Sequence, residues 1–143
     1  MDTDVWSPLF MPGRKAHPSV ARWRTLLTGR TIVISEQTRA EVIGGLLDAG
    51  MGPARARAAI DQLNRTATVP VDDALADTCA QVYANCKRIG HPLHAKDHTG
   101  DRWIAATAIH TGLPLLSNDG IFRDVPGLVL LEQAQVADED NGG

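Results

Sequence analysis

The chain lacks the long apolar segments that a membrane protein needs. None of its 143 residues belongs to a stretch approaching the roughly 20 apolar residues of a membrane-spanning helix. The charged and apolar segments of a signal peptide are also missing from its start. Repeats, low-complexity segments and interior linkers are absent too. We therefore predict a cytoplasmic protein with one folded domain over residues 1–134 and no membrane contact.

Cysteine is scarce, since the chain has only Cys79 and Cys86. They lie in a pattern that predicts a helix, and their separation along it places their backbones roughly 10 Å apart at about 1.5 Å per residue. A disulfide requires Cα atoms within about 7 Å of each other. We therefore expect two free thiols that pack as small, buried hydrophobic side chains.

The chain also lacks an excess of positive charge, and its net charge of −3 argues at first against nucleic acid as a partner. Part of the negative charge lies in residues 135–143, which we expect to be a disordered acidic tail. Without Asp138, Glu139 and Asp140, 14 acidic residues face 14 basic ones. The basic residues gather in two groups: Arg14, Lys15, Arg22, Arg24 and Arg30, and then Arg55, Arg57 and Arg65. These groups predict either an electropositive rim around an acidic pocket or merely solvated helix faces.

The residues that are present alternate between helical and strand-like patterns. Apolar residues recur at helical spacing in five segments: 20–27, 38–49, 53–65, 72–89 and 101–111. Short apolar segments typical of strands lie at 31–35, 68–71, 113–117 and 127–131. This alternation predicts an α/β fold in which helices cover both faces of a parallel sheet.

Four carboxylates lie where a strand or a helix begins or ends: Asp2, Glu41, Asp101 and Asp119. Asp119 directly follows the expected strand 113–117, and Glu41 and Asp101 lie near the beginnings of helices. In a parallel sheet all three positions face the edge where ligands bind. Asp2 joins them only if a strand precedes it. Acidic side chains gather against their mutual repulsion when a cation holds them, so their convergence would make a metal-dependent nuclease site.

Four motifs carry a resemblance to a known family: DTDVWS at 2–7, TRAEVIGGL at 38–46, DRWIAATAI at 101–109 and LLSNDGIF at 115–122. They resemble the PIN domain, and specifically the toxins of VapC-type toxin–antitoxin pairs, over nearly the whole chain. The resemblance implies a three-layer α/β/α sandwich with a central, mostly parallel sheet of four to five strands. It also implies an endoribonuclease, a hydrolase that cuts RNA with bound Mg²⁺ or Mn²⁺.

On this resemblance, Asp2, Glu41, Asp101 and Asp119 are both the catalytic residues and the metal ligands. Asp2 and Asp119 would bind the ion most directly, and the other two acids would act partly through waters. No further cofactor is implied. The implied partners are RNA (tRNA, rRNA or mRNA), a cognate antitoxin and a second copy of the chain in a homodimer. We expect the helices 20–27 and 53–65 to make the antitoxin or dimer contact.

The N-terminus departs from the family, in which an apolar strand precedes the first acid. Only Met1 precedes Asp2 here, so we expect either an upstream start or a shortened strand that fixes Asp2 loosely. The alternative function is therefore a degenerate module that binds RNA or antitoxin without cleavage. A phosphatase of the haloacid-dehalogenase type, suggested by Asp2 and Asp4, is disfavoured because Trp6 stands where that motif has Thr or Val.

Each acid also has a purely structural interpretation. Glu41 follows Thr38 at the spacing of a capping box, and Asp101 suits the first turn of any helix. Asp119 fits a turn, and Asp2 fits a disordered terminus. Asp4, Asp97, Ser117, Thr3 and Asn118 are weaker candidates for the site.

Aromatic and imidazole side chains offer further candidates. His91, His94 and His98 suggest zinc, but without a fourth ligand we expect them to face solvent or RNA. Trp103 is expected in the core. Trp6 and Phe10, which we expect in an irregular stretch near the first acid, are the better candidates to contact a nucleotide or a partner.

Overall fold

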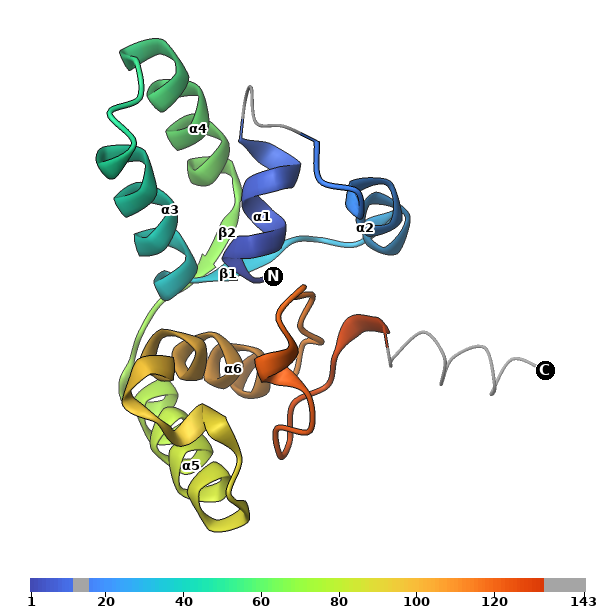
Figure 1. Cartoon of the computed structure of the whole chain (residues 1–143), viewed down its shortest axis with the longest axis vertical. Helices are drawn as coiled ribbons and strands as arrows, with labels where there is room; N and C mark the ends of the chain where they lie inside the picture. The colour runs from blue at the N-terminus through green and yellow to red at the C-terminus, as the bar shows by residue number, and fades with distance from the viewer. Residues whose placement is uncertain (12–15, 133–143) are drawn as a thin grey trace, which may run out of the picture. The chain divides into compact units, whose positions relative to one another are not determined.

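The computed structural model describes residues 1–11 and 16–132, which form two compact units, Met1–Val69 and Pro70–Gly143. Each unit has its own hydrophobic core. Figure 1 shows the helices and strands of each unit. Within the described ranges, no helix combines the length and the apolar composition that crossing a bilayer requires.

The described residues of the first unit form four helices and two strands. In chain order they are α1 (Thr3–Phe10), α2 (Val20–Leu27), β1 (Val33–Ser35), α3 (Glu36–Asp48), α4 (Pro53–Arg65) and β2 (Ala67–Val69). Local chemistry sets several boundaries. Pro53 opens α4 at a position where its missing N–H costs nothing. The Ser35 hydroxyl accepts the Thr38 N–H at 3.0 Å and so caps α3.

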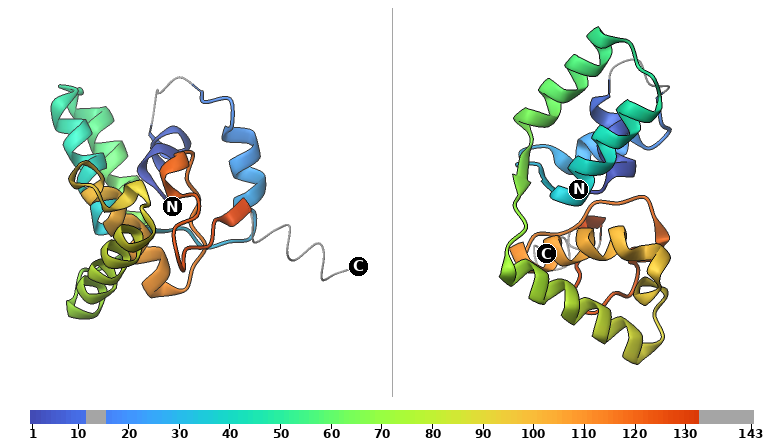
Figure 2. Two further views of the ribbon diagram at one scale, coloured as in Figure 1. Left: turned by 60° about the horizontal axis from the view of Figure 1, so that its bottom comes forward. Right: turned by 90° about the vertical axis from the view of Figure 1, so that its left-hand side faces the viewer.

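The two strands of the first unit pair in parallel, with Val33, Ile34 and Ser35 opposite Ala67, Thr68 and Val69. The helices α3 and α4 lie side by side (Figures 1 and 2). Their apolar faces meet α1 and β1 in a core of Trp6, Ile34, Val42, Leu46, Ala59 and Leu63. The amino group of Met1 donates to the Val33 carbonyl at 3.0 Å, which fastens the start of the chain beside β1.

The second unit is built on two packed helices. In chain order it contains α5 (Asp73–Ile89), the short 3₁₀ helices η1 (Pro92–His94) and η2 (Lys96–His98), α6 (Thr99–Thr111) and η3 (Gly120–Phe122). The Asp72 carboxylate caps α5 by accepting the Leu75 N–H at 2.8 Å. Gly90 and Gly112 end α5 and α6 in left-handed conformations, with φ of 71° and 66°. Leu75, Cys86, Leu93, Ile104, Leu115 and Phe122 are among its buried core residues.

The segments after α6 approach each other as a short parallel contact. Leu115 and Leu130 form a single bridge, in which the Leu115 N–H donates to the Val129 carbonyl at 2.8 Å and the Leu131 N–H to the Leu115 carbonyl at 2.9 Å. The expected strands 113–117 and 127–131 therefore pair only at this bridge, and these two described segments form no longer ladder.

The fold is α/β, rich in helices and built with a parallel sheet, as the sequence predicts. Among the described residues that sheet has two strands. The four- to five-stranded sheet, the three layers and the single domain over 1–134 stay predictions, and the tail 135–143 lies outside the described residues. The expected helices 20–27 and 53–65 are found, whereas α3 begins at Glu36 rather than at 38 because Ser35 caps it.

The expectation of an irregular stretch around Trp6 and Phe10 is wrong. Both residues lie on α1, which begins directly after its N-cap Asp2. Their rings approach to 5.4 Å, and Trp6 is completely buried, with its indole N–H donating to the Thr66 hydroxyl at 3.3 Å. Trp6 therefore stabilises the first core and cannot contact a nucleotide. Phe10 is partly buried against the same core.

Both cysteines are free thiols, as expected. Cys86 is fully buried and Cys79 is half-buried against the second core. Burial raises the pKa of both thiols, and the nearby Arg102 opposes this rise. Trp103 is also packed, in part, against the second core, as the sequence predicts.

Candidate metal centre

The four predicted ligands are divided between the two units. Asp2 and Glu41 belong to the first unit, and Asp101 and Asp119 belong to the second. Within residues 1–11 and 16–132, no group of three or more His, Cys, Asp or Glu side chains is placed to hold a metal ion. The convergence of all four acids therefore stays a prediction, and each pair has its own geometry.

In the first unit a hydroxyl group joins the start of α1 to α3. The Asp2 carboxylate is 5% exposed and accepts the N–H of Thr3 at 2.7 Å, as the N-cap of α1. The hydroxyl of the same Thr3 donates to Oε2 of Glu41. The Gln37 amide donates to Oε1 of Glu41 at 2.8 Å. Both oxygens of Glu41 thus have a neutral donor, and Thr3, a weaker candidate in the sequence, orients this acid.

The capping-box interpretation of Glu41 is wrong. Ser35 is the N-cap of α3, and Thr38 lies inside the helix, so Glu41 is one turn beyond the capping position. Its carboxylate instead reaches α1 through Thr3. The Gln37–Glu41 contact follows the i, i+4 spacing that brings helical side chains together, and the sequence could have revealed it.

In the second unit Asp101 lies in the first turn of α6, and its partner is a histidine. Nδ1 of His98 lies 2.8 Å from Oδ2 of Asp101, with both side chains about one-third exposed or less. Because a carboxylate only accepts, the proton of this hydrogen bond belongs to Nδ1. The three-residue spacing of the pair at a helix start was a readable signal that the sequence interpretation missed.

Asp119 lies directly before η3, and both its carboxylate and its backbone N–H make hydrogen bonds. Its Oδ1 accepts the Ile121 N–H at 3.0 Å, and its own N–H donates to the Ser117 hydroxyl at 3.0 Å. Ser117 therefore does contact Asp119, although through the backbone. The carboxylate has the N-cap role that the turn interpretation predicts, and the segment around it packs beside α6.

Arg102 secures the turn that leads into Asp101. Its guanidinium donates to the carbonyls of Leu93 and Ala95 at 2.9 and 2.6 Å, and to the Thr99 hydroxyl at 3.0 Å. It also lies 5.5 Å from the centre of the Tyr83 ring on α5. The sequence did not predict this role, because its main acceptors are backbone carbonyls, which no residue type marks.

The histidines of the same turn are partly exposed and also bind the backbone, and their contact with solvent or RNA stays a prediction. Nδ1 of His91 accepts the Leu93 N–H at 3.1 Å, so its Nε2 carries the proton and donates to the Arg123 carbonyl at 2.7 Å. His94 donates from Nδ1 to the His91 carbonyl at 2.6 Å. Both residues therefore connect backbone segments.

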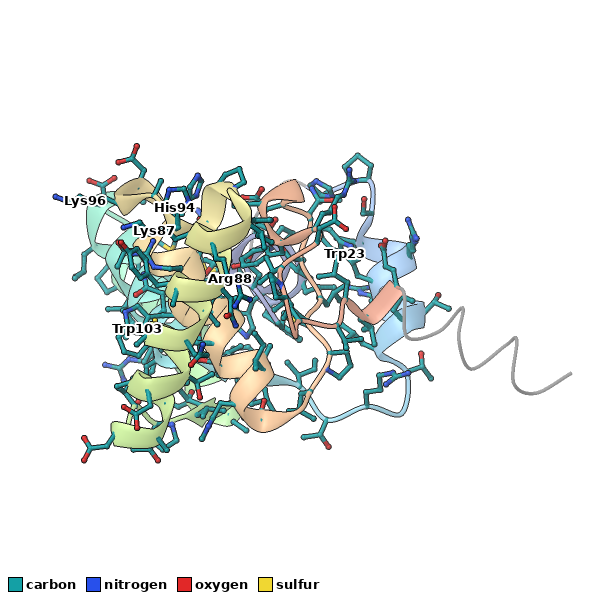
Figure 3. The ribbon with its side chains drawn as sticks, turned by 90° about the horizontal axis from the view of Figure 1, so that it is seen from below. Trp23, Lys87, Arg88, His94, Lys96 and Trp103 are labelled. Carbon is teal, nitrogen blue, oxygen red and sulfur yellow. The ribbon has the colours of Figure 1, made fainter. Side chains whose placement is uncertain are left out.

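Exposed cations surround this turn. Lys87 and Arg88 are exposed on the last turns of α5, and Lys96 is exposed in η2; Figure 3 shows them together with His94. Lys87 also lies 5.7 Å from the centre of the Tyr83 ring. In the first unit the basic residues of α2 and α4 are exposed as well, which fits both a rim and solvated faces. Arg14 and Lys15 lie outside the described residues.

The donor set fits a hard divalent cation. All four predicted ligands offer carboxylate oxygens, which Mg²⁺ and Mn²⁺ prefer, whereas zinc sites are dominated by sulfur and nitrogen. The donors that already hold Glu41 and Asp101 fix these carboxylates without neutralising them by a lysine or arginine.

With the fold and the acids in place, the class of the protein follows: the chain belongs to the PIN-domain family, whose model matches residues 1–128. Two solved structures are similar to it. One is VapBC2 from Rickettsia felis bound to a DNA fragment from their promoter, with a TM-score of 0.65, 21% identity, and coverage of 90% of this chain and 91% of that one. The other is DNA-bound VapBC from Salmonella typhimurium, with a TM-score of 0.67, 25% identity, and coverage of 90% and 92%.

These likenesses confirm the resemblance to VapC-type PIN proteins that the four motifs predict. No curated protein matches the sequence. The family membership supports a nuclease-type activity, and the choice of nucleic acid and of metal ion belongs to the proposal that follows.

Proposed function

We propose that this chain is a metal-dependent endoribonuclease that hydrolyses RNA phosphodiester bonds and serves as the toxin of a toxin–antitoxin pair, inhibiting translation or growth. One observation carries the proposal: the PIN model matches residues 1–128, a range that includes Asp2, Glu41, Asp101 and Asp119. Each of these acids lies at the start of a helix or within its first two turns.

The four acids would hold Mg²⁺ or Mn²⁺. When bound, the ion supplies charge neutralisation at the phosphate and a lowered pKa for water. The chain contributes the geometry. Thr3 and Gln37 hold the two oxygens of Glu41, His98 holds one oxygen of Asp101, and the Ile121 N–H holds one oxygen of Asp119. Carboxylates fixed before the ion arrives lose less conformational freedom when they bind it.

The RNA would be held by the cations near Asp101. A chain of contacts runs from Lys87 through the Tyr83 ring to Arg102, and from Arg102 to the turn that contains Lys96. Phosphate groups bind such exposed cations without regard to base sequence. This electropositive surface, Lys87, Arg88 and Lys96, supports a polyanionic substrate despite the net charge of −3.

A cognate antitoxin and a second copy of the chain are the proposed protein partners. The similar solved structures are VapBC complexes, which supports an antitoxin. Ile60 on α4 is 38% exposed and Leu47 on α3 is 78% exposed, so both helices retain apolar surface for a contact. In α2, Trp23 and Leu26 are already buried, which makes this helix the weaker candidate. A cytoplasmic location fits these partners.

Asp119→Asn tests the enzyme directly. The asparagine keeps an oxygen that can accept the Ile121 N–H, so the fold should persist while one metal ligand loses its charge. We expect cleavage of a fluorogenic RNA to fall by about 100-fold or more, since metal-site charge stabilisation is worth several kcal/mol. The matched control is Asp77→Asn on the exposed face of α5. EDTA should abolish cleavage and excess Mn²⁺ should restore it. Full activity of Asp119→Asn would contradict the assignment.

The alternative is a module that binds RNA or antitoxin without cutting, and the capping contacts favour it. Asp2 and Asp119 each satisfy a helix N-terminus, which is a sufficient structural reason for both acids. Calorimetric titration with Mn²⁺ separates the two functions. Binding that vanishes in Asp101→Ala supports the enzyme, and no binding by the unmodified chain at millimolar Mn²⁺ supports the module.

A further inference from the structure

His98 is distinguished from the other histidines of its turn by what it contacts. His91 and His94 bind backbone carbonyls, whereas His98 binds the side chain of a predicted metal ligand. We propose that His98 is a positioning residue of the metal centre: its Nδ1–H fixes the Asp101 carboxylate so that the second oxygen stays directed to the cation. This inference rests on the proposed function.

The helix start itself argues against a merely structural role. His98 is the N-cap residue of α6, yet its side chain makes no capping hydrogen bond. At α1, α3 and α5 the side chains of the N-cap residues, Asp2, Ser35 and Asp72, each accept a helix N–H, whereas at α2 and α4 no side chain caps the helix. At α6 the N-cap side chain instead donates to an acid one turn later. A side-chain cap stabilises a helix by about 1 kcal/mol, and α6 lacks this contribution from His98. The His98 side chain donates its hydrogen bond to Asp101 instead.

The turn before α6 is fixed strongly enough to make this bond a positioning device. The His98 N–H donates to the Ala95 carbonyl at 3.1 Å, and the Thr99 hydroxyl donates to the Lys96 carbonyl at 2.7 Å. Arg102 also holds this turn, through the Ala95 carbonyl and the Thr99 hydroxyl. The backbone of His98 is therefore held in place, and the short side chain gives the imidazole few alternative positions.

A donor on one carboxylate oxygen has a defined consequence for a bound ion. Rotation of the Asp101 carboxylate would exchange its two oxygens and move the ligand atom. A hydrogen bond from Nδ1 to Oδ2 opposes this rotation and leaves Oδ1 as the ligand atom. Loss of such an outer partner typically weakens metal affinity about 10- to 100-fold. The effect concerns metal affinity before any RNA is bound.

The first test is Mn²⁺ affinity, measured by calorimetry on the full chain at one pH. We expect His98→Ala to weaken binding about tenfold or more. His98→Asn places an amide N–H near the Nδ1 position and should restore the affinity to within about threefold, whereas His98→Gln reaches the Nε2 position and should not. The matched control is His110→Ala, an exposed histidine in the last turn of α6, which should bind as the unmodified chain does.

Thermal unfolding of each variant separates positioning from stability. A His98→Ala variant that stays folded but binds weakly supports the inference, and so does rescue by asparagine alone. Unchanged affinity in His98→Ala, or rescue by glutamine alone, overturns it while leaving the proposed function intact. An unmodified chain that binds no Mn²⁺ overturns the metal-dependent function and this inference together.

A second measurement does not depend on metal at all. Long-range ¹H–¹⁵N NMR of the metal-free chain reports which ring nitrogen carries the proton. We expect protonation at Nδ1 of His98, and the opposite tautomer, with the proton on Nε2, at His91. A His98 ring protonated only at Nε2 could not donate to Asp101 and would overturn the inference.

Discussion

The two units hold their acids in different ways. In the first unit Thr3 contacts both acids, because its backbone N–H donates to Asp2 and its hydroxyl donates to Glu41. In the second unit each acid has its own partner, an imidazole for Asp101 and a backbone N–H for Asp119. The first pair should therefore respond to a change at one residue, and the second pair should respond only to separate changes.

Among the substitutions that test this difference between the units, Thr3→Val should have the largest effect on Mn²⁺ affinity and stability. The substitution keeps the shape of the side chain and removes the donor to Glu41. We expect Mn²⁺ affinity to fall about tenfold. We also expect the free energy of unfolding to fall by about 1–2 kcal/mol, since the lost bond involves a charged group. Calorimetry and urea unfolding measure the two quantities.

The control for this prediction is Thr3→Ser, which keeps the hydroxyl and should retain most of the affinity. If Thr3→Val and Thr3→Ser bind Mn²⁺ equally well, then Thr3 does not couple the two acids of the first unit.

Removing one helix cap in each unit should have a smaller effect, which is confined to the free energy of unfolding. Ser35 caps α3 in the first unit, and Asp72 caps α5 in the second. Ser35→Ala and Asp72→Ala should each lower the free energy of unfolding by about 1 kcal/mol. Urea unfolding checks this, with Asp73→Ala, one residue beyond the cap, as the control. Equal stability of Asp72→Ala and Asp73→Ala would contradict the assignment of Asp72 as the cap.

Single substitutions of exposed basic residues should have the smallest effect, a small change in RNA affinity. They test which of the two units binds RNA. Lys87→Ala should weaken binding of a single-stranded RNA about three- to fivefold and reduce the slope of log affinity against log salt by about 0.7. Arg57→Ala on α4 should leave the slope unchanged, although Arg57 is equally exposed. A salt titration followed by fluorescence anisotropy measures both, and the reverse result would place the RNA on the first unit.

Helix boundaries could be predicted from the sequence because local residues set them. Pro53 opens α4, Asp72 caps α5, and Gly90 and Gly112 end α5 and α6, as their types and positions indicate. The helix α1 was missed because the resemblance to the family led to the expectation of a strand around Asp2. The extent of strands at 113–117 and 127–131 was overestimated because apolar composition does not reveal how many residues pair.

The acids of the candidate site could be selected from the sequence, but their partners mostly could not. Thr3 and Glu41 are 38 residues apart, and only the packing of α1 against α3 brings them together. Arg102 reaches the Leu93 carbonyl, an acceptor that every residue possesses and that no sequence pattern marks. The pairs His98–Asp101 and Gln37–Glu41 are exceptions, because their spacing along a helix is local.

Arg102 has a consequence for the charge of its neighbour in the chain. The guanidinium of Arg102 is engaged by uncharged oxygens and by the face of a phenol ring, and consecutive side chains on a helix do not face each other. The charged group of Arg102 therefore has partners other than the Asp101 carboxylate. A metal ion that arrives there meets a carboxylate that is bound by the His98 imidazole and not by the neighbouring guanidinium.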